Sequence, residues 1–587
     1  MTILNLFKDL FFRFPWHFFM LFLFIFIQSS LNIMSVIAVA PLTDYLLERY
    51  GNDASKITQF LENFLAPFGI KLNLLSVCVF FGGVIFFNGL AAIATWYALL
   101  KIKYNLLVYL LTDTLGQFFR AQFLFFSQGN MGKLLNSFQQ EVIKIGDAFG
   151  HIAKFFSNIL QLIILFILPL LFSPKLTVVF ILVAAVISMP LWLLRKFAYR
   201  LGKKNTETAN VTTEILHESL SAAKLILGFG RQDKTISRYK KSLIEHSKAR
   251  VKFQTMEGGI GNLFLPLGVI SILVALYTAY LDDVPLADMA LVLFAFLRLM
   301  PIIGLLIQGK ASVEGFLPAY EQLQDLRKEA KALQEPEGKL YFESFKEKLI
   351  FKKVNFDYPE QKLALNEINL SIKKGEMTAL IGKSGSGKTT LMDLMLGLYK
   401  QTNGDILIDG KKFHEYNLNS YRERVGFVPQ DPQLLNTSIR ENLLWSNPKA
   451  NERQIWEACK LSNSDEFINH LPKKLDTILG DRGVRISVGQ RQRLSLARAI
   501  IRKPDLLFLD EATSSLDTES EKLIQQSISN LAGEITIVVI AHRLSTIRNA
   551  NYIYVLDKGK ILEEGTYNKL SKEENSKLSK MIKSQEI

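Results

Sequence analysis

A chain of 587 residues, of which 49% are hydrophobic and 43 are Phe, is too long for one domain and too apolar for an ordinary soluble protein. Its two cysteines, Cys78 and Cys459, exclude a disulfide framework and a cysteine-based zinc site. The formal charge of +14 is compatible with nucleic-acid binding, but most of the basic excess flanks apolar segments. A surface facing anionic lipid explains that placement, so we expect a membrane and no nucleic acid as partner.

Six apolar segments lie in the first 310 residues. Each is close to the roughly 20 residues that cross a bilayer, whereas buried helices of soluble proteins rarely exceed about 14 apolar residues. We therefore predict a transmembrane domain over residues 1–320, an all-α bundle of six helices. The predicted spans are roughly 18–43, 74–100, 152–174, 176–194, 258–281 and 284–308.

Basic residues set the predicted orientation of these spans. Lys101 and Lys103 follow the second span, and Arg195 and Lys196 begin a basic stretch after the fourth, so both ends should face the cytoplasm. Both chain termini are then cytoplasmic. The two long inside connections, 101–154 and 195–257, predict helical hairpins that reach roughly 35 Å beyond the bilayer at about 1.5 Å per residue.

The outside connection after the first span has a helical pattern of its own. Apolar residues recur at helical spacing from Ile57 to Phe68. Two interpretations are open: an amphipathic helix on the outer membrane face, or a helix packed on the extracellular ends of the bundle.

Two charged residues, Asp288 and Arg298, interrupt the sixth span. An arginine at mid-bilayer costs about 3 kcal/mol on insertion scales, so Arg298 should face a cavity, the bundle interior or an anionic partner. Ten residues of straight helix cover about 15 Å, too far for a direct pair with Asp288. Arg298 is therefore the candidate substrate residue, with a structural pairing as the alternative.

A charged segment at 321–340, which holds Pro336 and Gly338, is predicted to be a linker. Strands and helices then alternate over 341–587, which predicts an α/β domain. Residues 382–389 read Gly-Lys-Ser-Gly-Ser-Gly-Lys-Thr between an apolar strand and a helix, the pattern of a P-loop. Its backbone N–H groups cradle phosphates, Lys388 reaches the β- and γ-phosphates, and Thr389 offers a hydroxyl to Mg²⁺. The predicted nucleotide-binding residues here are Gly382, Lys383, Ser384, Gly385, Ser386, Gly387, Lys388, Thr389 and Thr390.

A second apolar strand, 506–509, ends in two carboxylates. Asp510 is expected to hold Mg²⁺ through water, and Glu511 to orient and polarise the attacking water.

Between the P-loop and these carboxylates lies the sequence Ile486-Ser487-Val488-Gly489-Gln490. It resembles the signature of ATP-binding cassette (ABC) transporters, which contacts the nucleotide held by another cassette. The resemblance implies that Tyr358 stacks on adenine, that Gln430 senses Mg²⁺ and the attacking water, and that His542 contacts the γ-phosphate. The implied catalytic residues are Glu511, His542 and Gln430; the metal residues are Thr389, Gln430 and Asp510; Tyr358, Ser487, Gly489, Gln490, Asp510 and Asp517 complete the nucleotide site.

The order of six spans followed by one cassette is similar to the type IV exporter branch of this family. The resemblance implies ATP and Mg²⁺ as cofactors, coupling helices near 125–135 and 216–232, and a homodimer, because two cassettes enclose each ATP. It also implies a multi-pass protein of the bacterial plasma (inner) membrane with its cassette in the cytoplasm. Val488 and Ile486 depart from the usual glycine and leucine, which is expected to affect the rate of turnover.

The expected activity is ATP hydrolysis coupled to export or flipping of an amphipathic substrate. The segment 296–301 is similar to the sixth span of lipid-linked oligosaccharide flippases, which favours a lipid or lipid-linked saccharide, although Gly304 and Leu305 occupy the stretch where a further arginine is expected. The alternatives are a lipid A-like flippase, a peptide or multidrug exporter, a siderophore-type importer, and a regulator or channel with residual ATPase. Glu511 argues against the last of these.

Overall fold

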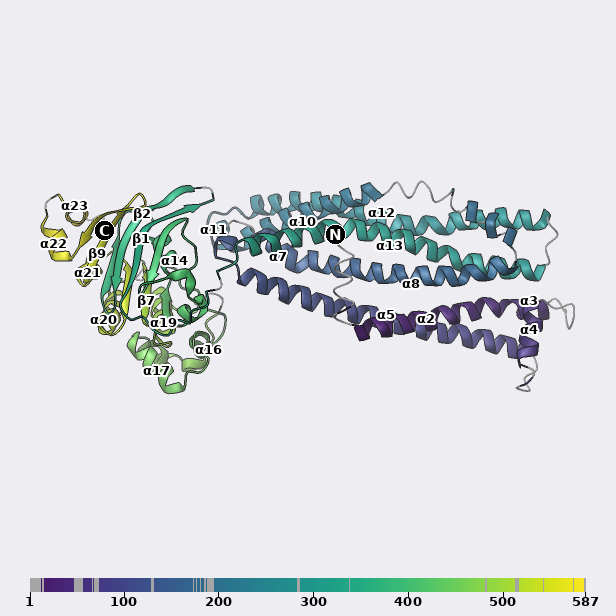
Figure 1. Cartoon of the computed structure of the whole chain (residues 1–587), viewed down its shortest axis with the longest axis horizontal. Coiled ribbons are helices and arrows are strands. Elements are labelled where there is room, and N and C mark those ends of the chain that lie inside the picture. Colours follow the sequence, from purple (N-terminus) through teal and green to yellow (C-terminus); the bar gives the residue numbers. More distant parts are fainter. Residues whose placement is uncertain are drawn as a thin grey trace. The chain divides into compact units, whose positions relative to one another are not determined.

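The computed structural model describes residues 12, 15–46, 56–65, 67, 73–127, 131–172, 174–175, 177–179, 181–183, 186, 195–281, 286–336, 338–359, 361–480, 483–511, 517–541, 543–573 and 575–584. The chain forms two compact units, which are coloured along the sequence in Figure 1. The first comprises Met1–Ala121 and Phe125–Leu333, and the second comprises Gln122–Leu124 and Gln334–Ile587.

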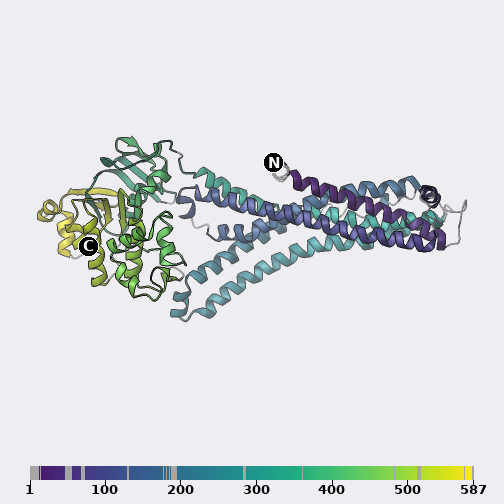
Figure 2. The same cartoon turned by 90° about the horizontal axis from the view of Figure 1, so that it is seen from below.

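The described part of the first unit is helical, and several of its helices are long (Figure 2). Its elements are α2 (Pro15–Ile37), α3 (Val39–Leu46), α4 (Lys56–Leu65), α5 (Leu74–Phe119), α6 (Leu124–Ser127, whose first residue belongs to the second unit), α7 (Met131–Asn136), the π-helix η3 (Ser137–Glu141), α8 (Val142–Phe172), α10 (Arg195–Ser221), α11 (Ala223–Gly228), α12 (Gln232–Leu281) and α13 (Leu286–Ala332). The 46 residues of α5 extend about 70 Å at 1.5 Å per residue, so this helix can cross a bilayer and continue beyond it. Helix α13 runs on to Ala332, which makes most of the segment predicted as a linker helical.

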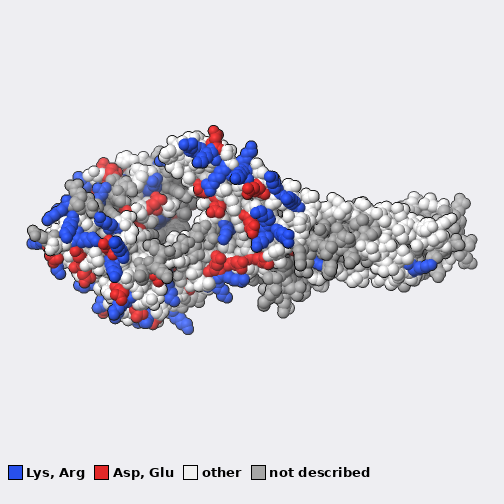
Figure 3. All heavy atoms as spheres, turned by 90° about the horizontal axis from the view of Figure 1, so that it is seen from above, with Lys and Arg blue, Asp and Glu red and all other residues white. Residues whose placement is uncertain are grey.

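Large apolar side chains on α5 point away from the rest of the unit. Leu75, Val79 and Ile93 are between 67% and 73% exposed, an arrangement that is stable in lipid but not in water. Figure 3 shows a long stretch of this unit's surface with almost no charged side chain. Helical stretches long and apolar enough to cross a membrane are Pro15–Leu46, Leu74–Phe119, Met131–Ile167 and Leu293–Ala332, and Gly268–Thr278 is a shorter one. The predicted fourth span, 176–194, lies largely outside the described residues.

Helix α4 lies in the segment after the first predicted span. For this segment the sequence leaves two positions open: on the outer membrane face, or packed on the extracellular ends of the bundle. The Thr58 hydroxyl donates a hydrogen bond to Asp44 Oδ2 at 2.5 Å, and both side chains are buried. Phe60, on the same helix, is 67% exposed. Helix α4 therefore packs on α3 through one face and presents apolar surface on another.

The second unit contains two sheets. Its strands are β1 (Lys348–Tyr358), β2 (Gln361–Lys373), β3 (Met377–Ile381), β4 (Asn403–Ile408), β5 (Lys411–Lys412), β6 (Val425–Val428), β7 (Leu506–Asp510), β8 (Thr536–Ile540), β9 (Tyr552–Asp557) and β10 (Lys560–Gly565). A four-stranded antiparallel sheet has the order β2-β1-β4-β5, and a six-stranded sheet has the order β10-β9-β3-β8-β7-β6. In the larger sheet every neighbouring pair is parallel except β10 with β9.

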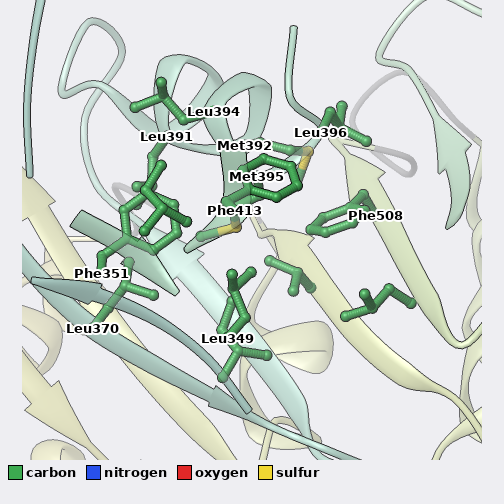
Figure 4. Close-up of a cluster of buried hydrophobic side chains, with 14 of the residues drawn as sticks. Leu349, Phe351, Leu370, Leu391, Met392, Leu394, Met395, Leu396, Phe413 and Phe508 are labelled. Carbon is green, nitrogen blue, oxygen red and sulfur yellow. The ribbon is translucent and has the colours of Figure 1, made fainter. Parts of the chain in front are cut away.

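Helices fill the space around these sheets. They are α14 (Lys388–Met395), α15 (Leu418–Glu423), α16 (Ile439–Leu444), α17 (Glu452–Leu461), α18 (Asp465–His470), α19 (Val488–Ile500), α20 (Thr518–Leu531), α21 (Leu544–Arg548), α22 (Tyr567–Lys572) and α23 (Lys577–Ser584), with short 3₁₀ turns at Phe413–Glu415 and Lys474–Asp476. Buried residues of α14, such as Met392 and Met395, pack with Phe351 of the smaller sheet and Phe508 of the larger one (Figure 4). This core fixes the helix that follows the P-loop relative to both sheets.

Candidate nucleotide site

The predicted site segments follow neighbouring parallel strands of the large sheet. The P-loop follows β3, the carboxylates end β7, Gln430 follows β6, and His542 follows β8. Parallel strands end at the same sheet edge, and ligands of α/β proteins bind at that edge. The fold therefore brings together the ends of strands that lie far apart in the chain. His542 itself lies outside the described residues.

The P-loop backbone needs glycine at specific positions. Gly382, Gly385 and Gly387 have φ angles of 150°, 76° and 102°, which side-chain-bearing residues rarely adopt. A Cβ at Gly382 would also lie 2.3 Å from the carbonyl oxygen of Leu556 on β9. The loop can therefore curl tightly against the sheet and lead directly into α14, which begins at Lys388.

Lys388 is buried and its ammonium group is held within the loop. Its Nζ donates hydrogen bonds to the carbonyl oxygens of Gly382 at 2.9 Å and Lys383 at 3.1 Å. Burial lowers the pKa of Lys388, while the charges of Glu511 and Asp510 oppose that change. The amine is thus held by two carbonyl oxygens of the P-loop, and it lies near enough to the two carboxylates for their charges to act on it.

The two carboxylates at the end of β7 have different surroundings. Asp510 is buried, and its Oδ1 has no hydrogen-bond partner among the described residues. Burial, with the neighbouring charge of Glu511, raises the pKa of Asp510 to about 6. An unpaired carboxylate oxygen at this edge suits a hard divalent cation such as Mg²⁺.

Glu511 accepts a hydrogen bond from Gln430 Nε2 at 2.7 Å. Its backbone has φ of +46°, an uncommon value for a residue with a side chain and one that recurs at functional sites. The glutamine and the glutamate that the sequence assigns to the attacking water are therefore in direct contact, although they are 81 residues apart.

Tyr358 ends β1 near the other side of the P-loop helix. Its hydroxyl is 3.0 Å from Thr390 Oγ1, and its ring packs edge-on against Phe356 and Tyr399. These contacts fix the ring next to the first turn of α14, where it can offer a face to a base. Sequence reasoning identified Tyr358 and Thr390 separately but not their contact.

The signature residues form the start of α19. Ser487 caps this helix: its Oγ accepts from Gln490 N at 3.2 Å, and its own N–H donates to Gln490 Oε1 at 3.0 Å. Gly489 is buried, whereas Val488 is 41% exposed. Within the described residues, no hydrogen bond or ion pair joins Ser487 or Gln490 to the P-loop, Gln430 or Glu511. The helix start is therefore formed but belongs to a separate part of the surface.

Two further acidic residues of the cassette, Asp517 and Asp393, have shifted pKa values. Asp517 caps α20 by accepting a hydrogen bond from Ser520 N at 3.1 Å, which lowers the pKa of Asp517. Asp393, which sequence reasoning missed, lies on α14; burial, with the charge of Asp510, raises the pKa of Asp393 to about 7. A carboxylate inside an otherwise apolar helix pattern, Leu-Met-Asp-Leu-Met, was the available signal.

These features define a P-loop nucleotide hydrolase domain fused to a helical membrane domain. Models of two protein families match the chain: "ABC transporter transmembrane region" over residues 18–299 and "ABC transporter" over residues 365–514. The chain belongs to the ABC transporter family. It is a multi-pass membrane protein that uses ATP and couples ATP hydrolysis to transmembrane transport.

Characterised relatives extend over most of the chain. The heterocyst differentiation ATP-binding protein HepA of Nostoc sp. is 33% identical over 449 residues, 76% of this chain and 74% of that protein. The ATP-dependent lipid A-core flippase of Pectobacterium atrosepticum is 33% identical over 457 residues, 76% of this chain and 78% of that protein. The flippase of the same name in Escherichia coli K12 is 30% identical and covers 83% of this chain and 85% of that protein.

The fold is also similar to a solved structure, a bacterial Atm1-family ABC exporter with ATP bound. The TM-score is 0.84 at 20% sequence identity, with 98% of this chain and 99% of that chain covered. The predictions of the family, of a helical membrane domain with an α/β cassette, and of an ATP hydrolase coupled to transport are thereby confirmed.

Proposed function

We propose that this protein is a homodimeric, ATP-driven exporter or flippase of a lipid or lipid-linked saccharide in a bacterial plasma membrane, with its cassette in the cytoplasm. The observation that carries the choice of cargo is the set of relatives named lipid A-core flippases, each matched over more than three quarters of its length. Arg298, inside an apolar helix, supports a cargo with an anionic head. The alternatives of a peptide or multidrug exporter and of a siderophore-type importer have no comparable support.

The residues of the nucleotide site have distinct proposed roles. The P-loop backbone from Gly382 to Thr390 and the amine of Lys388 hold the phosphates, and the Tyr358 ring stacks on the base. Glu511 orients and polarises the attacking water, with Gln430 fixing the carboxylate through their 2.7 Å hydrogen bond. His542 and Asp517 are proposed to complete the site near the γ-phosphate.

Thr389, Gln430 and Asp510 are the proposed Mg²⁺ residues, Asp510 acting through water. Mg²⁺ neutralises charge that develops on the phosphates. We expect Asp510→Asn to raise the Mg²⁺ concentration for half-maximal ATP hydrolysis about 10- to 100-fold, because the amide keeps the shape but loses the charge. Titration of ATPase activity with Mg²⁺ at fixed ATP measures this. An unchanged Mg²⁺ requirement would remove Asp510 from the metal site.

Two surfaces support a homodimer. The start of α19 is formed at Ser487 but has no bond to the described P-loop side of its own cassette, so a second copy can use it. In and next to α11, Leu220, Leu225, Leu227 and Phe229 are 61% to 73% exposed. This segment belongs to a predicted cytoplasmic hairpin, where water makes such exposure costly unless a partner covers it.

The cargo proposal is tested at Arg298. Its Nη1 donates to Asn32 Oδ1 at 3.2 Å, and its guanidinium carbon lies 5.5 Å from the centre of the Phe294 ring. We expect Arg298→Ala to reduce flipping of an anionic lipid in proteoliposomes about tenfold or more, because a hydrogen-bonded charge partner is lost. Arg298→Lys should recover part of the transport, since it keeps the charge but not the planar donors.

The control is Arg250→Ala, which removes an exposed arginine of α12 outside the apolar stretch. It should leave flipping unchanged. Equal transport in wild type, Arg298→Ala and Arg298→Lys would exclude Arg298 from the cargo path.

A further inference from the structure

Three polar side chains meet inside the helical unit, one each from α2, α5 and α13. Asn88 Nδ2 donates a hydrogen bond to Asn32 Oδ1 at 2.9 Å, and Arg298 Nη1 donates to the same oxygen at 3.2 Å. We call Asn32, Asn88 and Arg298 the midspan cluster. One amide oxygen therefore holds both a cation and a second amide in place.

The midspan cluster lies at one depth. Asn32, Asn88 and Arg298 each occupy about the fifteenth position of the apolar stretches 18–43, 74–100 and 284–308, close to the middle of each. Polar side chains at this depth are costly and mark functional sites, and transporters bind their substrates near the bilayer midplane. Three of them in contact at mid-depth indicate a site rather than scattered polar residues.

Two polar groups of the midspan cluster lack a hydrogen-bond or charge partner among the described residues. Asn32 is 8% exposed and its Oδ1 accepts two hydrogen bonds. Asn88 Oδ1 is buried without a hydrogen-bond partner in the described part of the chain. Arg298 makes a single hydrogen bond there, contacts the Phe294 ring, and has no carboxylate within ion-pair distance among the described side chains. The described residues therefore supply neither an anion for the guanidinium nor a donor for Asn88 Oδ1.

These two requirements define the chemistry of a ligand. We infer that the midspan cluster binds a lipid headgroup in which hydroxyl groups adjoin a phosphate, Arg298 binding the phosphate and Asn88 Oδ1 accepting from a hydroxyl. A phosphodiester without hydroxyls offers only acceptors, so it would satisfy Arg298 and leave Asn88 Oδ1 unpaired. Asn32 is a positioning residue that orients the other two. The inference rests on the proposed function, because it assigns the headgroup class of the transported lipid.

Two lipids of equal charge can be compared to test the hydroxyl requirement apart from the phosphate requirement. Phosphatidylinositol carries a phosphate next to a ring of hydroxyls, and phosphatidylmethanol with the same acyl chains carries the phosphate alone. The full-length protein is reconstituted in phosphatidylcholine nanodiscs, and binding of each lipid is measured by native mass spectrometry. Stimulation of ATPase activity and flipping are measured in proteoliposomes. We expect wild type to bind phosphatidylinositol about tenfold more tightly, since a buried acceptor is left unpaired with the other lipid.

The variant Asn88→Leu keeps a side chain of similar size and removes the acceptor, together with the amide group that donates to Asn32. In this variant the preference for phosphatidylinositol over phosphatidylmethanol should fall to about twofold or less. Phosphatidylmethanol should still bind through Arg298. Asn158→Leu is the matched control: it replaces a buried asparagine of α8 and should retain the wild-type preference. Basal ATPase activity and the unfolding temperature report whether each variant is folded.

The outcomes separate this inference from the proposed function. Equal binding of the two lipids by wild type overturns the headgroup assignment without the need for any variant, even if both lipids are flipped. An equal loss of preference in Asn88→Leu and Asn158→Leu overturns it as well. A third outcome is possible: wild type prefers phosphatidylinositol and Asn88→Leu loses that preference, but neither lipid is flipped or stimulates the ATPase. In that case the assignment of the cluster as a headgroup site stands, and the proposal that the protein transports lipid is contradicted.

Discussion

Glu511→Gln is expected to reduce ATP hydrolysis about 10²- to 10⁴-fold, the usual contribution of a positioned acid–base group. The amide keeps the size of the side chain and can still bond to Gln430, whose Nε2 lies 2.7 Å from Glu511 Oε2, but it no longer polarises water. Binding of ATP should stay within about threefold of wild type, because the P-loop contacts are untouched. Single-turnover hydrolysis and equilibrium nucleotide binding measure the two quantities.

The control for Glu511→Gln is Glu534→Gln, which makes the same change at an exposed position of the cassette. It should hydrolyse ATP at the wild-type rate. Hydrolysis by Glu511→Gln within about tenfold of wild type would assign the attacking water to another group.

Heterodimers of defined composition should also differ strongly in ATPase activity. A dimer of one Lys388→Ala chain and one Ser487→Ala chain has both lesions in one site and an intact second site if Ser487 completes the partner's site. A dimer of one wild-type chain and one chain with both substitutions has one lesion in each site. Because losing one donor to a reacting group costs about 10²- to 10³-fold, the first dimer should retain roughly half of wild-type activity and the second about 1%.

The two dimers contain the same substitutions, so each is the control for the other. Two affinity tags and tandem purification give each species, and the ATPase rate per dimer is measured. If Ser487 acted in its own chain, the result would reverse: the first dimer would be nearly inactive and the second would retain half. Equal rates would mean that Ser487 contributes to neither site.

Helix α13 illustrates why a local pattern can mislead. The charged segment 321–340 is predicted as a linker, yet α13 continues to Ala332, and the division between the two units falls after Leu333. Charge does not end a helix; Pro336 and Gly338, the residues that disfavour one, come later.

The sequence by itself determined the features that depend on neighbouring residues. The apolar stretches indicated helices long enough to cross a membrane, and the glycine spacing indicated the loop around Lys388, because each of these needs only residues within one helix or one turn.

Only the tertiary structure decided which distant residues meet. The contact of Gln430 with Glu511 requires β6 beside β7, and the burial of Asp393 requires α14 between two sheets. The midspan cluster joins side chains 56 and 266 positions apart, on helices whose order in the chain does not fix which of them are neighbours. Helix and strand periods set the face on which a residue lies, but packing of the whole core selects the partner of that face.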